Sequence, residues 1–130
     1  MSFLDKLGKE WLFGDGGTGT ILQEKGLKAG ELPETWNLSH PEEIIDLHLN
    51  YLLAGSDLIT TNTFGANALK YPEDLRQIVE TAVSHAREAR RRSGKKDAYI
   101  ALDIGQQVKH SSHLSWRQRS HTLTIRQREP

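Results

Sequence analysis

The distribution of hydrophobic positions predicts alternating strands and helices between residues 11 and 105. Short apolar runs occupy residues 11–14, 57–63 and 98–105, and polar or glycine residues close each of them. Runs of this length, bounded by turn residues, are typical of strands rather than helices. Because they are nearly continuous in apolar character, they favour strands that helices cover on both faces.

Three other segments have the spacing of helices. Residues 20–25 form a short one, and residues 74–92 form a long one that Gly94 ends. Between them, Ser39 and Pro41 precede two glutamates and predict a helix start, and Gly55 predicts its end. Apolar and aromatic positions recur at helical spacing in this middle segment: Ile44, Ile45, Leu47, His48, Tyr51 and Leu52. We expect residues 28–43 to be mainly connection.

The order of these elements is strand, helix, strand, helix, strand. Such alternation predicts a parallel sheet with right-handed crossovers, and therefore an α/β fold. Each predicted strand also ends in polar residues, first Asp15, then residues 61–63, then Asp103. In open α/β sheets and in barrels, ligands bind at the carboxyl ends of the strands. We therefore expect a ligand-binding face at these three strand ends.

The segment DGGTGT, residues 15–20, is the strongest candidate for such a site. Gly16, Gly17 and Gly19 remove side chains from a loop whose main-chain N–H groups could then approach a ligand closely. The segment lacks both the lysine of a phosphate-binding loop and the full spacing of a dinucleotide fingerprint. A tight turn without a ligand is the alternative interpretation.

Composition narrows the possible classes of protein. The 130 residues suffice for one small domain, and 17 basic against 17 acidic side chains give no net field for nucleic acid or membrane. No apolar run reaches the length of a membrane span, and the charged N-terminus is unlike a secretory signal, so we expect a cytoplasmic protein. The absence of cysteine excludes disulfides, thiolate zinc sites and a cysteine nucleophile from this chain.

Four motifs together resemble the N-terminal part of the homocysteine S-methyltransferase family. They are DGGTGTILQ, LPETWNLSHPEEI, AGSDLITTNTFGAN and ALDIG, in the family's order and spacing from Phe13 to Gly105. Within the family, the resemblance is strongest to the homocysteine-binding module of cobalamin-dependent methionine synthase. It implies a (β/α)₈ barrel, of which residues 1–105 would form an incomplete N-terminal βαβαβ portion.

The resemblance also implies a binding site for homocysteine as the small-molecule substrate. Asp15 would take its ammonium group, and the main-chain amides of Gly17 and Thr18 would receive its carboxylate, a pairing of opposite charges. The full set of expected substrate-binding residues is Asp15, Gly16, Gly17, Thr18, Thr61, Asn62, Thr63, Phe64 and Asp103. We predict no catalytic residue and no metal ligand in this chain. His48 and Trp36 are interpreted as packing residues rather than as ligand contacts.

The zinc ion that the family resemblance implies does not agree with the composition of this chain. The resemblance implies a zinc ion held by downstream cysteines that activates the homocysteine thiol, but this chain has no cysteine. We therefore expect the chain to bind homocysteine without transferring a methyl group on its own. Cobalamin and methyltetrahydrofolate would act through other modules, so the methyl donor stays open.

Residues 106–130 form a basic tail of a different composition. The family usually continues after DIG with Pro-Thr-Gly-Lys. Deleting one nucleotide from the codons GGA-CCA-ACA-GGT-AAA yields Gly-Gln-Gln-Val followed by Lys or Asn, which matches residues 105–109. A frameshift, with a tail that is disordered, is our preferred interpretation. The alternative is a small α/β binding module whose tail contacts nucleic acid or an acidic partner through Arg117, Arg119, Arg126 and Arg128.

Overall fold

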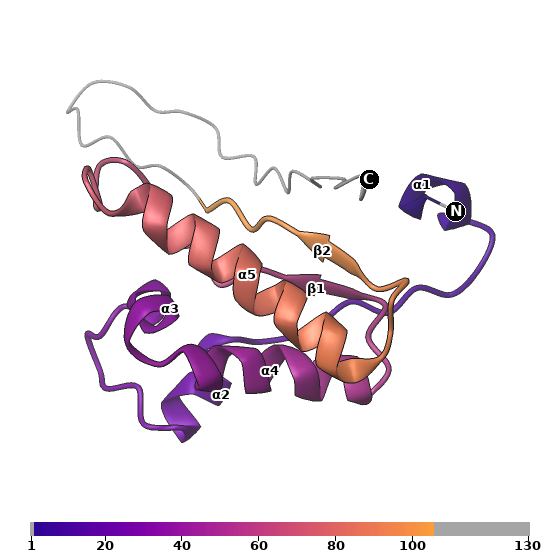
Figure 1. Cartoon of the computed structure of the whole chain (residues 1–130), viewed down its shortest axis with the longest axis horizontal. Helices are drawn as coiled ribbons and strands as arrows, with labels where there is room; N and C mark the ends of the chain where they lie inside the picture. Colours follow the sequence, from indigo (N-terminus) through magenta and orange to yellow (C-terminus); the bar gives the residue numbers. More distant parts are fainter. Residues whose placement is uncertain (1, 106–130) are drawn as a thin grey trace.

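The computed structural model describes residues 2–105, in which helices pack against a small parallel sheet (Figure 1). The tail and the interpretations placed on it lie outside the described residues. In chain order the elements are α1 (Phe3–Lys6), α2 (Gly19–Glu24), the 3₁₀ helix η1 (Pro33–Thr35), α3 (Trp36–Ser39), α4 (Pro41–Leu53), β1 (Leu58–Thr60), α5 (Leu75–Ser93) and β2 (Tyr99–Ala101).

The sheet consists of β1 and β2, which pair in parallel with Ile59 opposite Ile100. The second and third predicted strands are therefore confirmed, although both are shorter than expected. The first is not formed as a strand, because residues 11–14 make only a single parallel bridge, between Gly14 and Leu58. Trp11 and Phe13 are exposed, so this segment is also not buried as predicted. The segment lies beside β1 but lacks a second flanking partner in the described part of the chain.

The predicted helices are present as α2, α4 and α5, and local signals explain their ends. Pro41 occupies the first turn of α4, where its missing N–H costs nothing. The cap before it is His40 rather than Ser39, and it makes no side-chain capping bond. Gly94 ends α5 with a φ of 72°, a left-handed conformation that glycine adopts without strain. Two short elements, η1 and α3, lie within the segment that we predicted as connection.

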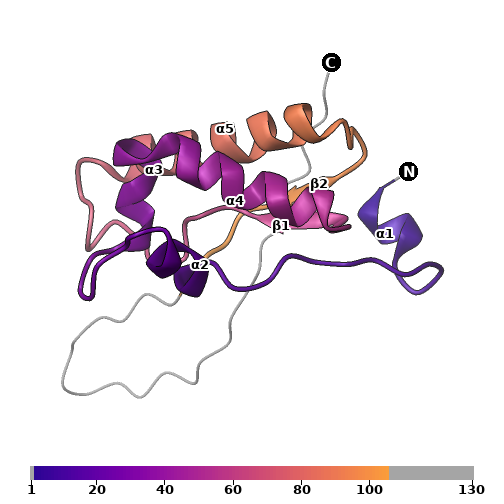
Figure 2. The same cartoon turned by 90° about the horizontal axis from the view of Figure 1, so that it is seen from below.

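Two hydrophobic clusters hold the helices in place. One lies between α4, α5 and the sheet and is built from Ile45, Leu52, Ile59, Ala86, Ala89 and Ala98. The other joins α2, α3 and α4 through Leu22, Leu27, Trp36, Ile44 and Leu47. Figure 2 shows α4 and α5 together on one side of the sheet. The helical layer thus fixes the position of the strand ends, where the candidate site lies.

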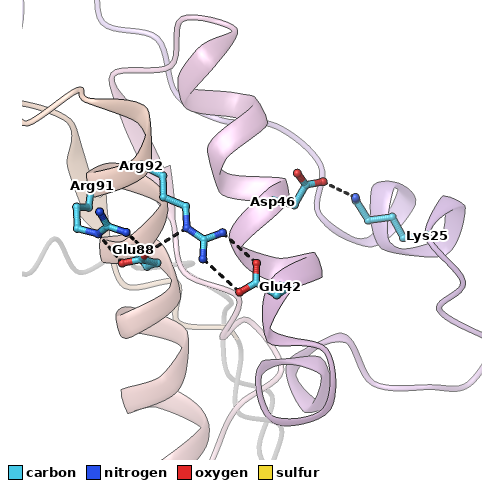
Figure 3. A network of polar contacts seen from close by, with 6 residues as sticks. All are labelled: Lys25, Glu42, Asp46, Glu88, Arg91 and Arg92. Carbon is cyan, nitrogen blue, oxygen red and sulfur yellow. Dashed lines mark hydrogen bonds and ion pairs between the residues drawn. The ribbon is translucent and has the colours of Figure 1, made fainter.

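Ion pairs on the surface add a second connection between the same helices (Figure 3). Arg92 of α5 donates to both carboxylate oxygens of Glu42 on α4, over 2.9 and 3.2 Å. Arg91 and Arg92 both donate to Glu88, and these bonds lower the pKa of Glu88 to about 2. Lys25, the residue that follows the end of α2, donates to Asp46 of α4 over 2.6 Å. Lys25 is only partly exposed, whereas the arginine–glutamate pairs lie at the surface, where such pairs contribute little to stability.

Within residues 2–105, no helix combines the length and the apolar character needed to cross a lipid bilayer.

Candidate functional site

A pocket of about 850 Å³ opens at the carboxyl ends of the two strands. Its walls come from the glycine loop before α2, from η1, from the end of β1 and the loop after it, and from the residues after β2. The residues that line it are Gly16, Thr18, Gly19, Leu32, Pro33, Glu34, Thr60, Asn62, Phe64, Gly65, Asn67, Leu69, Lys70 and Asp103. This is the edge of the sheet where the sequence places its polar strand ends.

Asp15 lies beside this pocket and is bound to Thr60. Its carboxylate oxygen Oδ2 accepts the Thr60 main-chain N–H over 2.8 Å and the Thr60 hydroxyl over 3.1 Å. Phe13 and Asp15 form main-chain hydrogen bonds with Leu58, as adjacent parallel strands do. At the next position of this ladder the Thr60 N–H would bond to a main-chain carbonyl, and the Asp15 side chain accepts it instead. Partial burial raises the pKa of Asp15, whereas the bonds from Thr60 oppose that rise. Carboxylate lone pairs remain for a further donor.

The glycine loop presents main-chain groups next to this carboxylate. In the described part of the chain, the N–H groups of Gly17 and Thr18 have no hydrogen-bond partner. The Gly17 carbonyl accepts the Tyr51 hydroxyl over 2.7 Å, which fixes the loop to α4. A Cβ on Gly16 would lie only 3.0 Å from the Tyr51 oxygen, so a glycine allows this close approach. Sequence reasoning treated Tyr51 only as part of the apolar stripe and missed this contact.

Thr61 and Thr63 join the two strand ends through a closed cycle of hydrogen bonds. The Asp103 carbonyl can only accept, so the Thr63 hydroxyl donates to it over 2.6 Å. The Thr61 hydroxyl must then donate to Thr63 over 2.7 Å, and it accepts the Asp103 N–H over 3.2 Å. Both threonines are buried and neither lines the pocket. Their geometry therefore indicates that they hold Asp103 in place, and substrate contact by them stays a prediction.

The remaining predicted residues reach the pocket directly. Asn62 is only 6% exposed and lines the pocket, whereas Phe64 is largely exposed at its rim. Asp103 also lines it, and burial followed by the negative charge of Asp15 raises its pKa. The two carboxylates thus influence one another across the strand ends.

Glu34 is a pocket residue that sequence reasoning missed. It is 3% exposed on η1, and its Oε1 accepts the Tyr71 hydroxyl over 2.8 Å and Lys70 Nζ over 3.3 Å. Burial and the Glu34 carboxylate together raise the pKa of Tyr71 well above its usual range. A Cβ on Gly65 would lie 2.5 Å from Glu34 Oε1, so a larger residue at this position would have to displace the Glu34 carboxylate. The Pro-Glu pair at residues 33–34, typical of a helical first turn, was the available signal.

Within residues 2–105, no group of three or more acidic, histidine or cysteine side chains could hold a metal ion. His48 is fully buried, and among the described residues neither of its ring nitrogens has a hydrogen-bond partner. This agrees with a packing role for His48. Trp36 is likewise in the core, at 2% exposure.

Comparison with known proteins places the chain in a family. The sequence model of the family described as homocysteine S-methyltransferase matches residues 12–127. The S-methylmethionine–homocysteine S-methyltransferase BHMT2 of Pongo abelii is 33% identical over 98 residues, which cover 75% of this chain and 26% of that protein. The methionine synthase of Mycobacterium tuberculosis is 37% identical over 70 residues, or 49% of this chain and 6% of that protein. The chain belongs to the homocysteine S-methyltransferase family.

Solved structures agree on the fold. The metallated form of the homocysteine methyltransferase MmuM from Escherichia coli superimposes with a TM-score of 0.68 at 21% identity. The match covers 78% of this chain and 40% of MmuM. The chain therefore spans about a quarter of BHMT2 and less than half of MmuM. The described residues form a mixed α/β unit with a small parallel sheet, and the complete (β/α)₈ barrel stays a prediction.

Proposed function

We propose that this chain supplies the homocysteine-binding part of a homocysteine S-methyltransferase. The observation that carries the proposal is the presence in one loop of the Asp15 carboxylate and of two N–H groups, those of Gly17 and Thr18, that have no hydrogen-bond partner in the described part of the chain. An α-amino acid carries an ammonium and a carboxylate on one carbon. A carboxylate and a pair of main-chain donors complement these two groups in charge.

The surrounding contacts keep these groups in position before a ligand arrives. Thr60 donates hydrogen bonds to the Asp15 carboxylate, and the Tyr51 hydroxyl donates to the Gly17 carbonyl, so the side chain and the loop are each held to a regular element. Such preorganisation reduces the entropy that binding must overcome. Bound ammonium would stabilise the ionised carboxylate and lower the raised pKa of Asp15. Affinity for the substrate is therefore expected to fall when Asp15 is protonated.

The zinc ion that the family resemblance implies does not fit this chain. The sequence contains no cysteine, and residues 2–105 hold no cluster that could ligate the ion. The chain's own residues can bind and orient the amino-acid part of the substrate. We assign no step of thiol activation or methyl transfer to them.

Replacing Asp15 with asparagine is expected to weaken homocysteine binding by about 10- to 100-fold, the worth of a charge-assisted hydrogen bond. Asparagine keeps an acceptor for Thr60, so the strand end is expected to stay intact. Binding is measured by NMR titration, which detects weak affinities, with the exposed Asp97→Asn variant as the control. Equal affinities for wild type and the Asp15 variant would remove Asp15 from the site.

The gene itself tests where the zinc ligands would lie. If residues 106–130 are out-of-frame translation, the alternative frame downstream of Gly105 is expected to encode the next strand, a cysteine and a later Cys-Cys pair. Sequencing the locus and translating all three frames is sufficient. The family match extends to residue 127, past the change of composition. Frames without these cysteines would end the frameshift interpretation and make the tail a true extension.

A further inference from the structure

Both N–H groups of the Asn62 side chain, which belongs to the pocket lining, are hydrogen-bonded. Its Nδ2 donates to the Pro33 carbonyl over 2.8 Å and to Asn37 Oδ1 over 3.3 Å. In return, Asn37 Nδ2 donates to the Asn62 main-chain carbonyl over 2.8 Å. Asn37 lies on α3 and is fully buried, so the pair connects that helix to the end of β1.

These partners determine which way both amides point. A main-chain carbonyl can only accept, so the Pro33 oxygen requires the Asn62 nitrogen to face it. The Asn62 carbonyl likewise requires the Asn37 nitrogen, which leaves Asn37 Oδ1 to face Asn62 Nδ2. All three bonds are therefore consistent with one arrangement only. Flipping either amide would set two acceptors or two donors against each other.

One polar atom of the Asn62 side chain is left for a ligand. Both N–H groups are used by the fold, and Oδ1 has no partner among the described residues. The only buried side-chain polar atoms without a partner in residues 2–105 are the two ring nitrogens of His48. Asn62 Oδ1 is consequently reached by solvent, in a residue that lines the pocket. Asn62, a residue of the pocket lining, thus offers solvent an oriented acceptor that cannot turn into a donor.

We propose that Asn62 accepts a hydrogen bond from the substrate through Oδ1, and that Asn37 is the positioning residue that holds Asn62 in this orientation. The inference rests on the proposed function, because the ligand is taken to be homocysteine. Homocysteine has two kinds of donor, its ammonium and its thiol. Either provides the N–H or S–H that the acceptor requires, and a ligand with only acceptors at this point is disfavoured.

Binding by the Asn62→Ala variant of the full chain tests the acceptor with three probes. L-Homocysteine has both donors, L-methionine has only the ammonium, and 4-mercaptobutanoate has only the thiol. The variant is expected to bind homocysteine about tenfold more weakly. It is also expected to lose affinity for methionine if the ammonium is the donor, or for 4-mercaptobutanoate if the thiol is the donor, but not for both. Asn50→Ala, an exposed amide on α4, is the matched control. Equal losses for all three probes, or no loss for homocysteine, would overturn the acceptor role.

The orientation is tested first by hydrogen exchange in the wild-type chain without a ligand, and then with an Asn37 variant. The Asn62 Nδ2 protons are expected to exchange with solvent at least tenfold more slowly than those of Asn50, since two bonds protect them. Asn37→Ala removes one of these two bonds, so it is expected to speed the exchange and to reduce homocysteine affinity in the same sense as Asn62→Ala. Equal exchange at Asn62 and Asn50 in the wild type would overturn the positioning role.

The outcomes separate the inference from the proposed function. If the wild-type chain binds homocysteine and Asn62→Ala binds it equally well, only the inference fails. If the wild-type chain does not bind homocysteine at all, the proposed function fails, and the acceptor role fails with it.

Discussion

Replacing Trp36 with alanine is expected to lower the free energy of unfolding by about 3–5 kcal/mol, as is usual for a buried tryptophan. Trp36 is 2% exposed and packs in the cluster that joins α2, α3 and α4. Its ring stacks on that of His40 with centroids 4.0 Å apart, and its Nε1 donates to Glu31. Domains of this size have total stabilities of only about 5–15 kcal/mol, so the variant would approach global unfolding.

Urea denaturation followed by circular dichroism measures this effect. Trp36→Phe keeps most of the ring but loses the bond to Glu31, so its loss is expected to be intermediate. Trp11→Ala is the matched control, because Trp11 is 88% exposed and its removal is expected to change stability little. Similar losses for Trp11→Ala and Trp36→Ala would contradict the placement of Trp36 in the core.

Acidification is expected to destabilise the chain through His48. Burial, with a smaller contribution from the charge of His85, lowers the pKa of His48 from 6.5 to about 4. Between pH 6.5 and 4, His48 is therefore protonated in the unfolded chain but neutral in the folded chain. Above pH 6.5 His48 does not lower the free energy of unfolding. As the pH drops from 6.5 toward 4, its effect reduces that free energy by about 3 kcal/mol in total.

His48→Leu tests this linkage, since leucine fills a similar space and cannot titrate. The variant is expected to match or exceed the wild type near pH 7, because it removes two buried nitrogens without partners. Between pH 6.5 and 4 its stability is expected to decline less steeply than that of the wild type. Denaturation curves at several pH values provide the comparison. Parallel declines in the two proteins would exclude His48 as the acid-sensitive group.

Local signals explain which elements the sequence predicts correctly. The helices α4 and α5 each have an apolar face, and glycine marks their ends, so neighbouring residues suffice to define them. The segment at residues 11–14 has strand character, but a strand also requires partners, and here a single bridge to Leu58 is formed. The short elements η1 and α3 depend on packing by Trp36 and Asn37, which no periodic pattern reveals.

The candidate site shows the same division. The sequence places Asp15, Asn62 and Asp103 at strand ends, and the structure brings them to one edge of the sheet. The sequence does not indicate which hydrogen bonds the neighbouring side chains form. The hydroxyls of Thr61 and Thr63 bond to each other and to the main-chain groups of Asp103, which lies about 40 residues later in the sequence. Partners at such separations are set by the fold and not by any local motif.

The order of pairing within the sheet bears on how the chain folds during synthesis. Leu58 bonds to the segment around Gly14 on one side of β1, and β2 lies on the other, so position in the sheet follows position in the chain. In the parallel ladder, the main-chain groups of Ile100 point away from β1. A growing polypeptide would thus add each strand at the outer edge, without displacing one already placed. This order of pairing is the one that assembly from the N-terminus during synthesis would require, with β2 as the edge to which a later strand would be added.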